Sequence, residues 1–219
     1  MPAFEIAPSL VSAPLLSLSD SLAQLRSAGV QKLHIDIEDG HFVPVMNLGT
    51  RFIEELRGSG FFLDVHLMVS NPEEIIPLAA RLGADAISVH LEASLYPRRH
   101  LSAIRSLGLQ AGLAVNPKTP LPDLDYLADR LDSLLVLTTE PEDPHSPFIP
   151  ATLNKIRQAR QWAAQAAPGL PITADGGVSA DNLSAVLVAG ASGVVVGRAL
   201  FAGADLQRSI EQLRKAAGS

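Results

Sequence analysis

Short apolar runs alternate along the whole chain with longer segments in which apolar residues recur at helical spacing. Short apolar runs bounded by turn residues are typical of strands buried in a parallel sheet. The runs predict eight strands, over Glu5–Ala7, Lys32–Asp36, Phe61–Leu67, Ala86–His90, Gln110–Val115, Ser133–Thr138, Ile172–Asp175 and Gly193–Val196.

Helical patterns fill the gaps between these runs, and four of them are clear: Leu15–Ala28, Asn71–Leu82, Ala151–Ala166 and Asp205–Ala217. In the first, Leu18, Leu22 and Leu25 share one helical face, and Gly29 supplies a stop. Asn71 and Pro72 together predict an N-cap followed by proline at the first helical position.

Regular alternation of strand and helix predicts parallel strands joined by crossover helices. Eight such units without a second compositional block favour closure into a (β/α)8 barrel, a single domain over residues 1–219. Barrels of roughly 200 to 250 residues commonly form one core. An open, doubly wound sheet is the alternative arrangement.

Composition narrows the class of protein. A hydrophobic fraction of 47% with 18% charged residues is typical of a folded globular chain, not a disordered one. The net charge of −6 and the lack of a basic run speak against nucleic acid as a partner. No apolar run approaches the roughly 20 residues of a membrane span, and the N-terminus lacks the basic start of a signal peptide. With no cysteine in the chain, we expect a cytoplasmic protein without thiolate chemistry.

Polar residues gather where the predicted strands end, which is where (β/α) barrels place their chemistry. His34 and Asp36 lie two apart on one strand and therefore point to the same face. His66 and Asp175 end two other strands. Two imidazoles and two carboxylates at one barrel mouth suit one divalent transition metal (Zn, Fe, Mn or Co), with zinc favoured. The alternating neighbours, which we expect to face the helices, are Leu33, Ile35 and Ile37.

Each of these four residues also has an ordinary structural explanation. A histidine at a strand end is commonly a hydrogen-bonded packing residue, and an aspartate before Gly-Gly commonly forms a turn. A buried histidine or aspartate is costly unless it is paired or bound to a metal. The shared position of all four at strand ends is what favours a metal site.

At these positions the sequence resembles the ribulose-phosphate 3-epimerase family. The matching stretches run from one end of the chain to the other: IAPSLVSA, HIDIEDGHFVP, LDVHLMVSNPEE, VHLEAS, AGLAVNPKTPL, FIPATLNKIR, ADGGVSADN and VVGRALF. The combination is specific, although DGGV and VGRA alone occur in several phosphate-binding barrels.

The resemblance implies an isomerase of the pentose phosphate pathway that inverts C3 of a ketose phosphate, turning D-ribulose 5-phosphate into D-xylulose 5-phosphate. It implies a metal held by His34, Asp36, His66 and Asp175, and an enediolate that the metal stabilises. Asp36 and Asp175 match the two carboxylates that transfer the proton on opposite faces. The matches to the family's substrate contacts are Ser9, His66, Gly176, Gly177 and Gly197. A homo-oligomer is implied as well.

The chain departs from the family in the loop after the sixth strand, which normally reads NPGFGGQ and here reads EPEDPHS from Glu140 to Ser146. Pro144 has no N–H to offer a phosphate, and the acidic residues would repel a phosphate if they pointed inward. Arg198 stands where the family has a small residue after Gly197, and it could bind a phosphate with two hydrogen bonds. Of three methionines near the enediolate, this chain keeps only Met68, with Glu38 and Leu137 in place of the others.

Three functions therefore remain open. The first is a 3-epimerase of a ketopentose 5-phosphate. The second is a 3-epimerase of a hexulose phosphate, similar to allulose 6-phosphate, or of another sugar. The third is a non-catalytic barrel that keeps the metal and has lost its phosphate loop.

Overall fold

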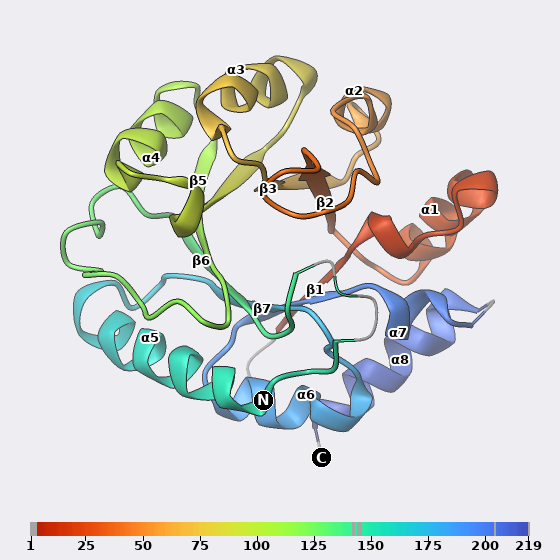
Figure 1. Ribbon diagram of the computed structural model, residues 1–219. Helices are drawn as coiled ribbons and strands as arrows, with labels where there is room; N and C mark the ends of the chain where they lie inside the picture. Colours follow the sequence, from red (N-terminus) through yellow and green to blue (C-terminus); the bar gives the residue numbers. More distant parts are fainter. Residues whose placement is uncertain (1–3, 142, 144–145, 204, 219) are drawn as a thin grey trace.

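Eight parallel strands surround a central axis, and the helices form an outer ring around them (Figure 1). The structure is a computed structural model that describes residues 4–141, 143, 146–203 and 205–218. The strands are β1 (Glu5–Pro8), β2 (Lys32–Glu38), β3 (Phe62–Met68), β4 (Ala86–His90), β5 (Gln110–Val115), β6 (Ser133–Leu137), β7 (Ile172–Asp175) and β8 (Gly193–Val196). All eight lie within a residue or two of the ranges that the apolar pattern predicts.

The strands pair in the order β1-β8-β7-β6-β5-β4-β3-β2, and every pair is parallel. β1 and β2 meet at the remaining edge through a parallel bridge between Ser9 and His34. The sheet therefore closes on itself, which confirms the barrel and excludes the open doubly wound sheet.

Six helices of the described chain lie between consecutive strands: α1 (Leu18–Ser27), α2 (Arg51–Leu56), α3 (Pro72–Leu82), α4 (Pro97–Ser106), α5 (Leu153–Ala166) and α6 (Ala180–Val188). The described residues that join β5 to β6 form no helix, and α7 (Arg198–Phe201) and α8 (Leu206–Ala216) follow β8. Short 3-10 turns precede or follow some of them, at Leu10–Ser12, Leu15–Ser17, Leu91–Ala93 and Pro150–Thr152. The segment predicted as one helix from Leu15 is therefore a 3-10 turn followed by α1. None of the described helices combines the length and the apolar character needed to cross a lipid bilayer.

The N-cap predicted at Asn71, with proline after it, is confirmed, although its side chain does not cap the backbone. Asn71 directly precedes α3, and Pro72 is the first helical residue, but the Asn71 side chain makes no cap bond to the backbone. Its Nδ2 instead donates to Glu74 Oε1 at 2.8 Å. The side-chain amide thus contacts a carboxylate of the first turn instead of capping a backbone N–H.

The strands carry two kinds of buried side chain because alternate residues point to opposite faces. Leu33, Ile35 and Ile37 are buried in the large apolar core that includes residues of the helices, as the alternation predicts. A second, small apolar cluster comes from the alternate positions of β1, β5, β6 and β8: Ala7, Ala114, Leu135, Leu137 and Val195. The inward positions of β2, β3 and β4 hold mainly polar side chains instead, among them His34, Asp36, His66 and His90, so one side of the barrel interior is apolar and the other mainly polar.

Candidate active site

Four side chains predicted to bind metal converge at the C-terminal ends of three strands. His34 and Asp36 come from β2, His66 from β3 and Asp175 from β7, and one ligand atom from each lies within 4.8 Å of all the others. The register of β2 and β3 brings this about in part, because Asp36 is paired directly with His66. The two histidine side chains are fully buried, and those of Asp36 and Asp175 are 7% and 13% exposed.

The distances between the ligand atoms fit a four-coordinate metal. His34 Nε2 lies 3.3 Å from Asp36 Oδ1 and 3.5 Å from Asp175 Oδ2. His66 Nδ1 lies 3.1 Å and 3.6 Å from the same two oxygens. The two nitrogens are 3.4 Å apart. Donors about 2.0 to 2.1 Å from a tetrahedral zinc are about 3.3 Å from one another, so the cluster could hold such an ion with little movement.

The electrostatics of the cluster reflect carboxylates crowded around buried imidazoles. Burial alone would lower the pKa of His34, but the neighbouring carboxylates, Asp36 first, outweigh burial and raise it well above its usual value. Burial likewise opposes ionisation of Asp36, yet His34 and His66 lower the pKa of that carboxyl. A bound cation would replace the proton that the imidazole otherwise takes up, because metal and proton compete for the same nitrogen lone pair.

Asp64 is a functional neighbour that the sequence reasoning missed. Its Oδ2 lies 3.1 Å from His34 Nδ1, on the side of the ring opposite the cluster. A carboxylate behind a ligating histidine fixes the ring orientation and leaves the other nitrogen free for the metal. The available signal was its place two residues before His66 on the same strand, which points both side chains into the barrel.

A second chain of contacts extends from His66 away from the cluster. His66 Nε2 lies 2.8 Å from His90 Nε2, and His90 Nδ1 lies 3.1 Å from Glu92 Oε2. Burial lowers the pKa of His90 to about 4. Burial opposes ionisation of Glu92, but hydrogen bonds from His90 and from neighbouring groups lower its pKa to about 2. The arrangement is an imidazole between a carboxylate and a candidate ligand histidine.

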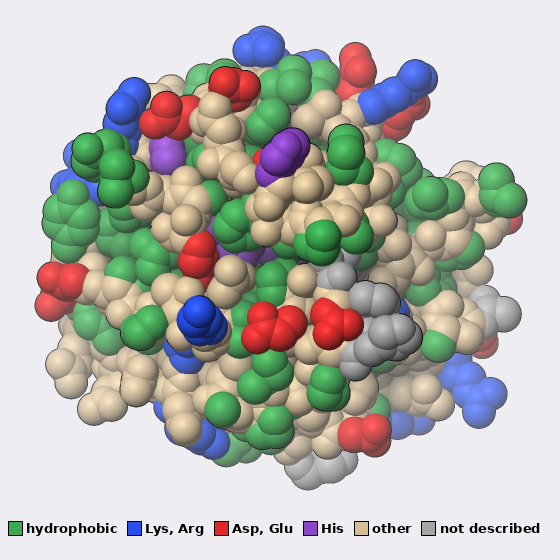
Figure 2. All heavy atoms as spheres, in the orientation of Figure 1, with side chains coloured by type: hydrophobic (Ala, Val, Ile, Leu, Met, Phe, Trp, Pro, Cys, Tyr) green, Lys and Arg blue, Asp and Glu red, His purple; other side chains and the backbone are tan. Residues whose placement is uncertain are grey.

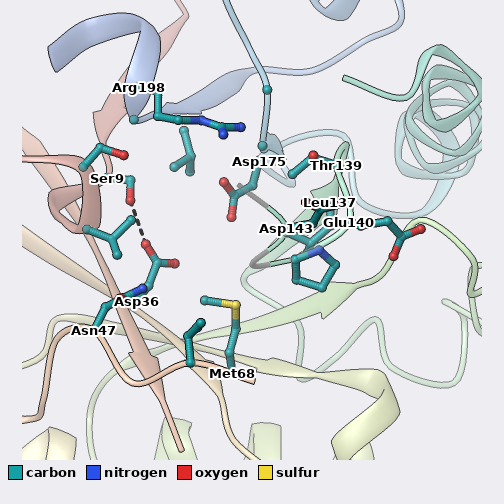
Figure 3. A pocket seen from close by; sticks show the side chains of 18 residues that line it. Ser9, Asp36, Asn47, Met68, Leu137, Thr139, Glu140, Asp143, Asp175 and Arg198 are labelled. Carbon is teal, nitrogen blue, oxygen red and sulfur yellow. Dashed lines mark hydrogen bonds between the residues drawn. The ribbon is translucent and has the colours of Figure 1, made fainter. Parts of the chain in front are cut away.

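A cavity of about 490 Å³ opens beside the cluster, and Asp36 and Asp175 face one another across it (Figure 3). Ser9 Oγ donates to Asp36 Oδ2 at 2.7 Å, which leaves Asp36 Oδ1 turned toward the histidines. Met68 and Leu137 also line the cavity. His34 and His66 lie behind the carboxylates, fully buried.

The glycines and Arg198 lie together on another side of the same cavity. Gly176, Gly177, Gly197 and Arg198 all line it, and the last three also line an adjoining hollow of about 240 Å³. A Cβ on Gly177 would lie 2.9 Å from the Phe148 backbone nitrogen, so only glycine fits this close approach. Arg198 Nη2 lies 3.5 Å from the carbonyl oxygen of Ser146.

The altered loop after β6 contributes two acidic residues to the mouth. Glu140 and Asp143 line the cavity, and both are exposed. The Glu140 carboxylate points away from the gap between Asp36 and Asp175 (Figure 3). Glu142, Pro144 and His145 lie outside the described residues.

On the face of the molecule that Figure 2 shows, lysine and arginine side chains are scattered over the surface rather than gathered in a patch.

Glu38, which stands in place of one of the expected methionines, is buried at the end of β2, where it pairs with Met68 of β3. Its carboxylate accepts a hydrogen bond from the Asn47 backbone N–H at 2.6 Å and another from Asn47 Nδ2 at 3.1 Å. Asn47 lines the cavity. The loop after β2 is thereby held against the barrel by a polar contact close to the candidate site.

Comparison with known proteins gives a consistent result over the whole chain. Residues 5–201 match the ribulose-phosphate 3 epimerase family. The ribulose-phosphate 3-epimerase of Escherichia coli (strain K12) is 37% identical over 98% of this chain and 96% of its own length. The ribulose-phosphate 3-epimerase of Bacillus subtilis (strain 168) is 35% identical over 96% of this chain and 98% of its own length.

Solved structures agree on the fold. KGPDC from Streptococcus mutans has a TM-score of 0.69 at 13% identity, over 98% of this chain and 98% of its own. Orotidine 5'-phosphate decarboxylase from Pyrococcus horikoshii has a TM-score of 0.66 at 17% identity, over 98% of this chain and 99% of its own. At such low identity these likenesses establish the barrel alone. Sequence relatives and family profile together establish more: the chain belongs to the ribulose-phosphate 3-epimerase family and is a carbohydrate epimerase, an isomerase.

Proposed function

We propose that this chain is a metal-dependent 3-epimerase that interconverts D-ribulose 5-phosphate and D-xylulose 5-phosphate. The observation that carries the proposal is the position of Asp36 and Asp175, which face one another across one cavity beside a cluster that fits a metal. Inversion at a carbon atom next to a carbonyl requires this arrangement of two proton-transfer groups. We further propose that zinc is the metal and that the chain forms a homo-oligomer.

The hydrogen on C3 of a ketose is acidic because the neighbouring C2 carbonyl can take up the negative charge. A divalent metal held by His34, Asp36, His66 and Asp175 supplies Lewis-acid stabilisation of that charge. One carboxylate removes the proton from one face of C3, and the other returns a proton to the opposite face. Asp36 and Asp175 take these two roles in either direction of the reaction.

Other residues of the cavity orient these groups and the substrate. Ser9 holds Oδ2 of Asp36, so that this carboxylate keeps a fixed direction toward the cavity. The buried side chains of Met68 and Leu137 exclude water from the reacting carbons. The phosphate binds near Gly176, Gly177 and Gly197, where backbone can approach closely, with Arg198 beside it.

The test is deuterium wash-in at C3 from D2O, followed by NMR of the sugar phosphate, together with metal analysis of the purified protein. We expect one divalent metal per chain and exchange with D-ribulose 5-phosphate. His34→Ala and His66→Ala should lose the metal. If both variants keep the wild-type metal content, the site is wrong; if the metal-loaded wild type shows no exchange, the chain is a non-catalytic metal-binding barrel.

A hexulose phosphate is the second candidate substrate, and the altered rim of the cavity favours it. Glu140 and Asp143 place carboxylates at the mouth. Such groups can accept hydrogen bonds from the additional hydroxyl of a longer sugar. A panel containing D-ribulose 5-phosphate, allulose 6-phosphate and unphosphorylated D-ribulose separates these cases by kcat/KM.

A further inference from the structure

We infer that His90 and Glu92 are positioning residues that fix the protonation of His66, so that its Nδ1 is presented to the metal without a proton. The inference rests on the metal site of the proposed function. It assigns a role to a buried histidine and to a glutamate whose side chain is 20% exposed, neither of which the proton-transfer scheme uses. Both lie after or at the end of β4, the strand next to the one that carries His66.

The geometry of the two rings identifies a hydrogen bond. The separation of 2.8 Å between His66 Nε2 and His90 Nε2 is a hydrogen-bond distance, too short for two nitrogens in simple van der Waals contact. The ring planes are inclined by only 26° with centroids 4.8 Å apart. One of the two nitrogens must therefore carry a hydrogen and the other must offer a lone pair.

The order of donors along the chain follows from its two ends. At one end, Glu92 Oε2 lies 3.1 Å from His90 Nδ1, and a carboxylate can only accept, so His90 Nδ1 carries the hydrogen. For His66 Nδ1 to be free of a proton, the single hydrogen between the two rings must lie on His66 Nε2, so that His90 Nε2 is the acceptor. At the other end, His66 Nδ1 faces the oxygens of Asp36 and Asp175, where a metal ligand must be unprotonated.

The surroundings hold this order in place. Glu92 Oε1 accepts the Asn116 backbone N–H at 2.8 Å, which fixes the carboxylate on the far side. The ring of Phe42 lies against His90 with centroids 4.6 Å apart, and both histidine side chains are fully buried. Water is thus excluded as an alternative partner. His34 has a direct carboxylate partner in Asp64, whereas His66 reaches its carboxylate through a second imidazole.

The test compares two substitutions of His90. His90→Phe keeps a flat ring and removes the acceptor, so that His66 Nε2–H is left without a partner and the proton moves to Nδ1, where it competes with the metal. His90→Gln offers an amide oxygen in its place. Losing such an outer partner typically weakens metal binding by about 10- to 100-fold, which we expect for His90→Phe, with much of the affinity regained in His90→Gln.

Matched controls come from a second histidine–glutamate pair away from the cluster. His100 Nε2 lies 3.2 Å from Glu73 Oε1, and His100 is buried as well. His100→Phe and Glu73→Gln should leave the zinc dissociation constant unchanged, whereas Glu92→Gln, which keeps an acceptor and loses its charge, should fall between wild type and His90→Phe. Thermal unfolding of each metal-free variant shows whether it is folded.

Proton positions are read directly by ¹⁵N NMR of the imidazoles, with zinc binding measured in a metal buffer. We expect His90 to be protonated at Nδ1 and His66 at Nε2. A His90 protonated at Nε2, or a folded His90→Phe or Glu92→Gln variant with wild-type zinc affinity, overturns the inference. If the wild-type protein shows the expected proton positions and binds no metal, the proposed function fails while the hydrogen-bond order stands.

Discussion

The two sides of the cavity differ in how they are built. On the side formed by β2, β3 and β7, the candidate ligands are largely buried side chains connected by contacts of about 3 Å, and the Asp64–His34 and Glu92–His90 pairs lie behind them. The side formed by the loops after β6 and β8 is exposed at Glu140 and Asp143, and its loop sequence departs from that of the family. The proposed function thus assigns the chemistry to the strands and recognition of the substrate's far end to the loops.

This difference follows from the physics of the two settings. Strand register fixes where Asp36 lies relative to His66, and a buried charge that loses its partner is strongly destabilising. A surface loop carries no such constraint and tolerates replacement. A chain can therefore keep its reaction while the residues that bind the distant part of the substrate change. Substitutions on the two sides test this division.

The largest effect is expected from the carboxylates. Asp175→Asn and Asp36→Asn each keep the size of the side chain and remove its ability to take up a proton. Turnover should fall by about 100-fold or more, the usual contribution of a positioned acid or base. Steady-state assays with metal content measured in parallel give the result.

Because both aspartates are also candidate ligands, lost turnover alone does not separate the two roles. Isotope exchange resolves them: a variant that still holds metal should exchange the C3 hydrogen from one face only. If both variants retain full turnover, the two-carboxylate scheme is wrong.

The next effect concerns Arg198, on the altered side. Its guanidinium lines both the main cavity and the adjoining hollow beside Gly177. A charged hydrogen bond to phosphate contributes roughly 1.5 to 3 kcal/mol, so Arg198→Ala should raise KM for a ketose phosphate roughly 10- to 100-fold. KM for the unphosphorylated ketose should change far less.

Arg208→Ala, on the exposed surface of α8, serves as the control and should leave both constants unchanged. Equal effects of Arg198→Ala on both substrates, or none on either, would show that this residue does not bind phosphate. The altered loop would then mark a substrate without a phosphate group.

Sequence reasoning predicted the barrel well because its strands follow the simplest pattern in the chain. In β2, Leu33, Ile35 and Ile37 face the helices and His34 and Asp36 face inward, so one alternation located both core and candidate ligands. The same rule gave the positions at which strands end. It could not give the contact of Asn71, which depended on which of several nearby acceptors the side chain reached.

The residues that contact the candidate metal ligands from behind were harder to predict from the sequence than the candidate ligands themselves. Asp64 lies at the inward position before His66, but its contact with His34 depends on the register between two strands. The pairing of His90 with His66 depends likewise on ring orientation. The loop from Glu140 to Ser146 has no periodicity. Its sequence therefore showed that the loop is more acidic than the family's, but could not predict where its side chains point.

An intermediate effect is expected at Asp39, in the loop after β2. Its carboxylate accepts backbone N–H groups of His41, Phe42 and Ser70 at 2.7 to 2.8 Å, and these bonds, although burial opposes them, lower its pKa to about 2. A carboxyl group whose folded pKa is lowered stabilises the protein above its unfolded pKa, near 4, and loses this contribution as the pH falls toward 2.

Asp39→Asn should therefore lower the free energy of unfolding at pH 7 by about 1 kcal/mol, after allowance for the partial exposure of the group. The gap between wild type and variant should close between about pH 4 and pH 2, the range between the ordinary and the lowered pKa. Urea unfolding at a series of pH values measures it. A gap that stays constant down to pH 2 would show that the loop does not depend on this charge.

The smallest effect is expected at Glu38. This residue lies at the end of β2, on the side built from strands, and stands where the family has a methionine. Its two hydrogen bonds from Asn47 hold a cavity-lining residue in place. In Glu38→Gln one of the two acceptors becomes a donor, so one bond is lost, which we expect to cost substrate binding about 0.5 to 1 kcal/mol. KM should rise roughly two- to fivefold with kcat nearly unchanged. Since Asn47 lies across the cavity from Arg198, the rise should be the same for phosphorylated and unphosphorylated ketoses (Figure 3). A rise confined to the phosphorylated substrate would instead place the phosphate on the β2 side and reverse the assignment of the two sides.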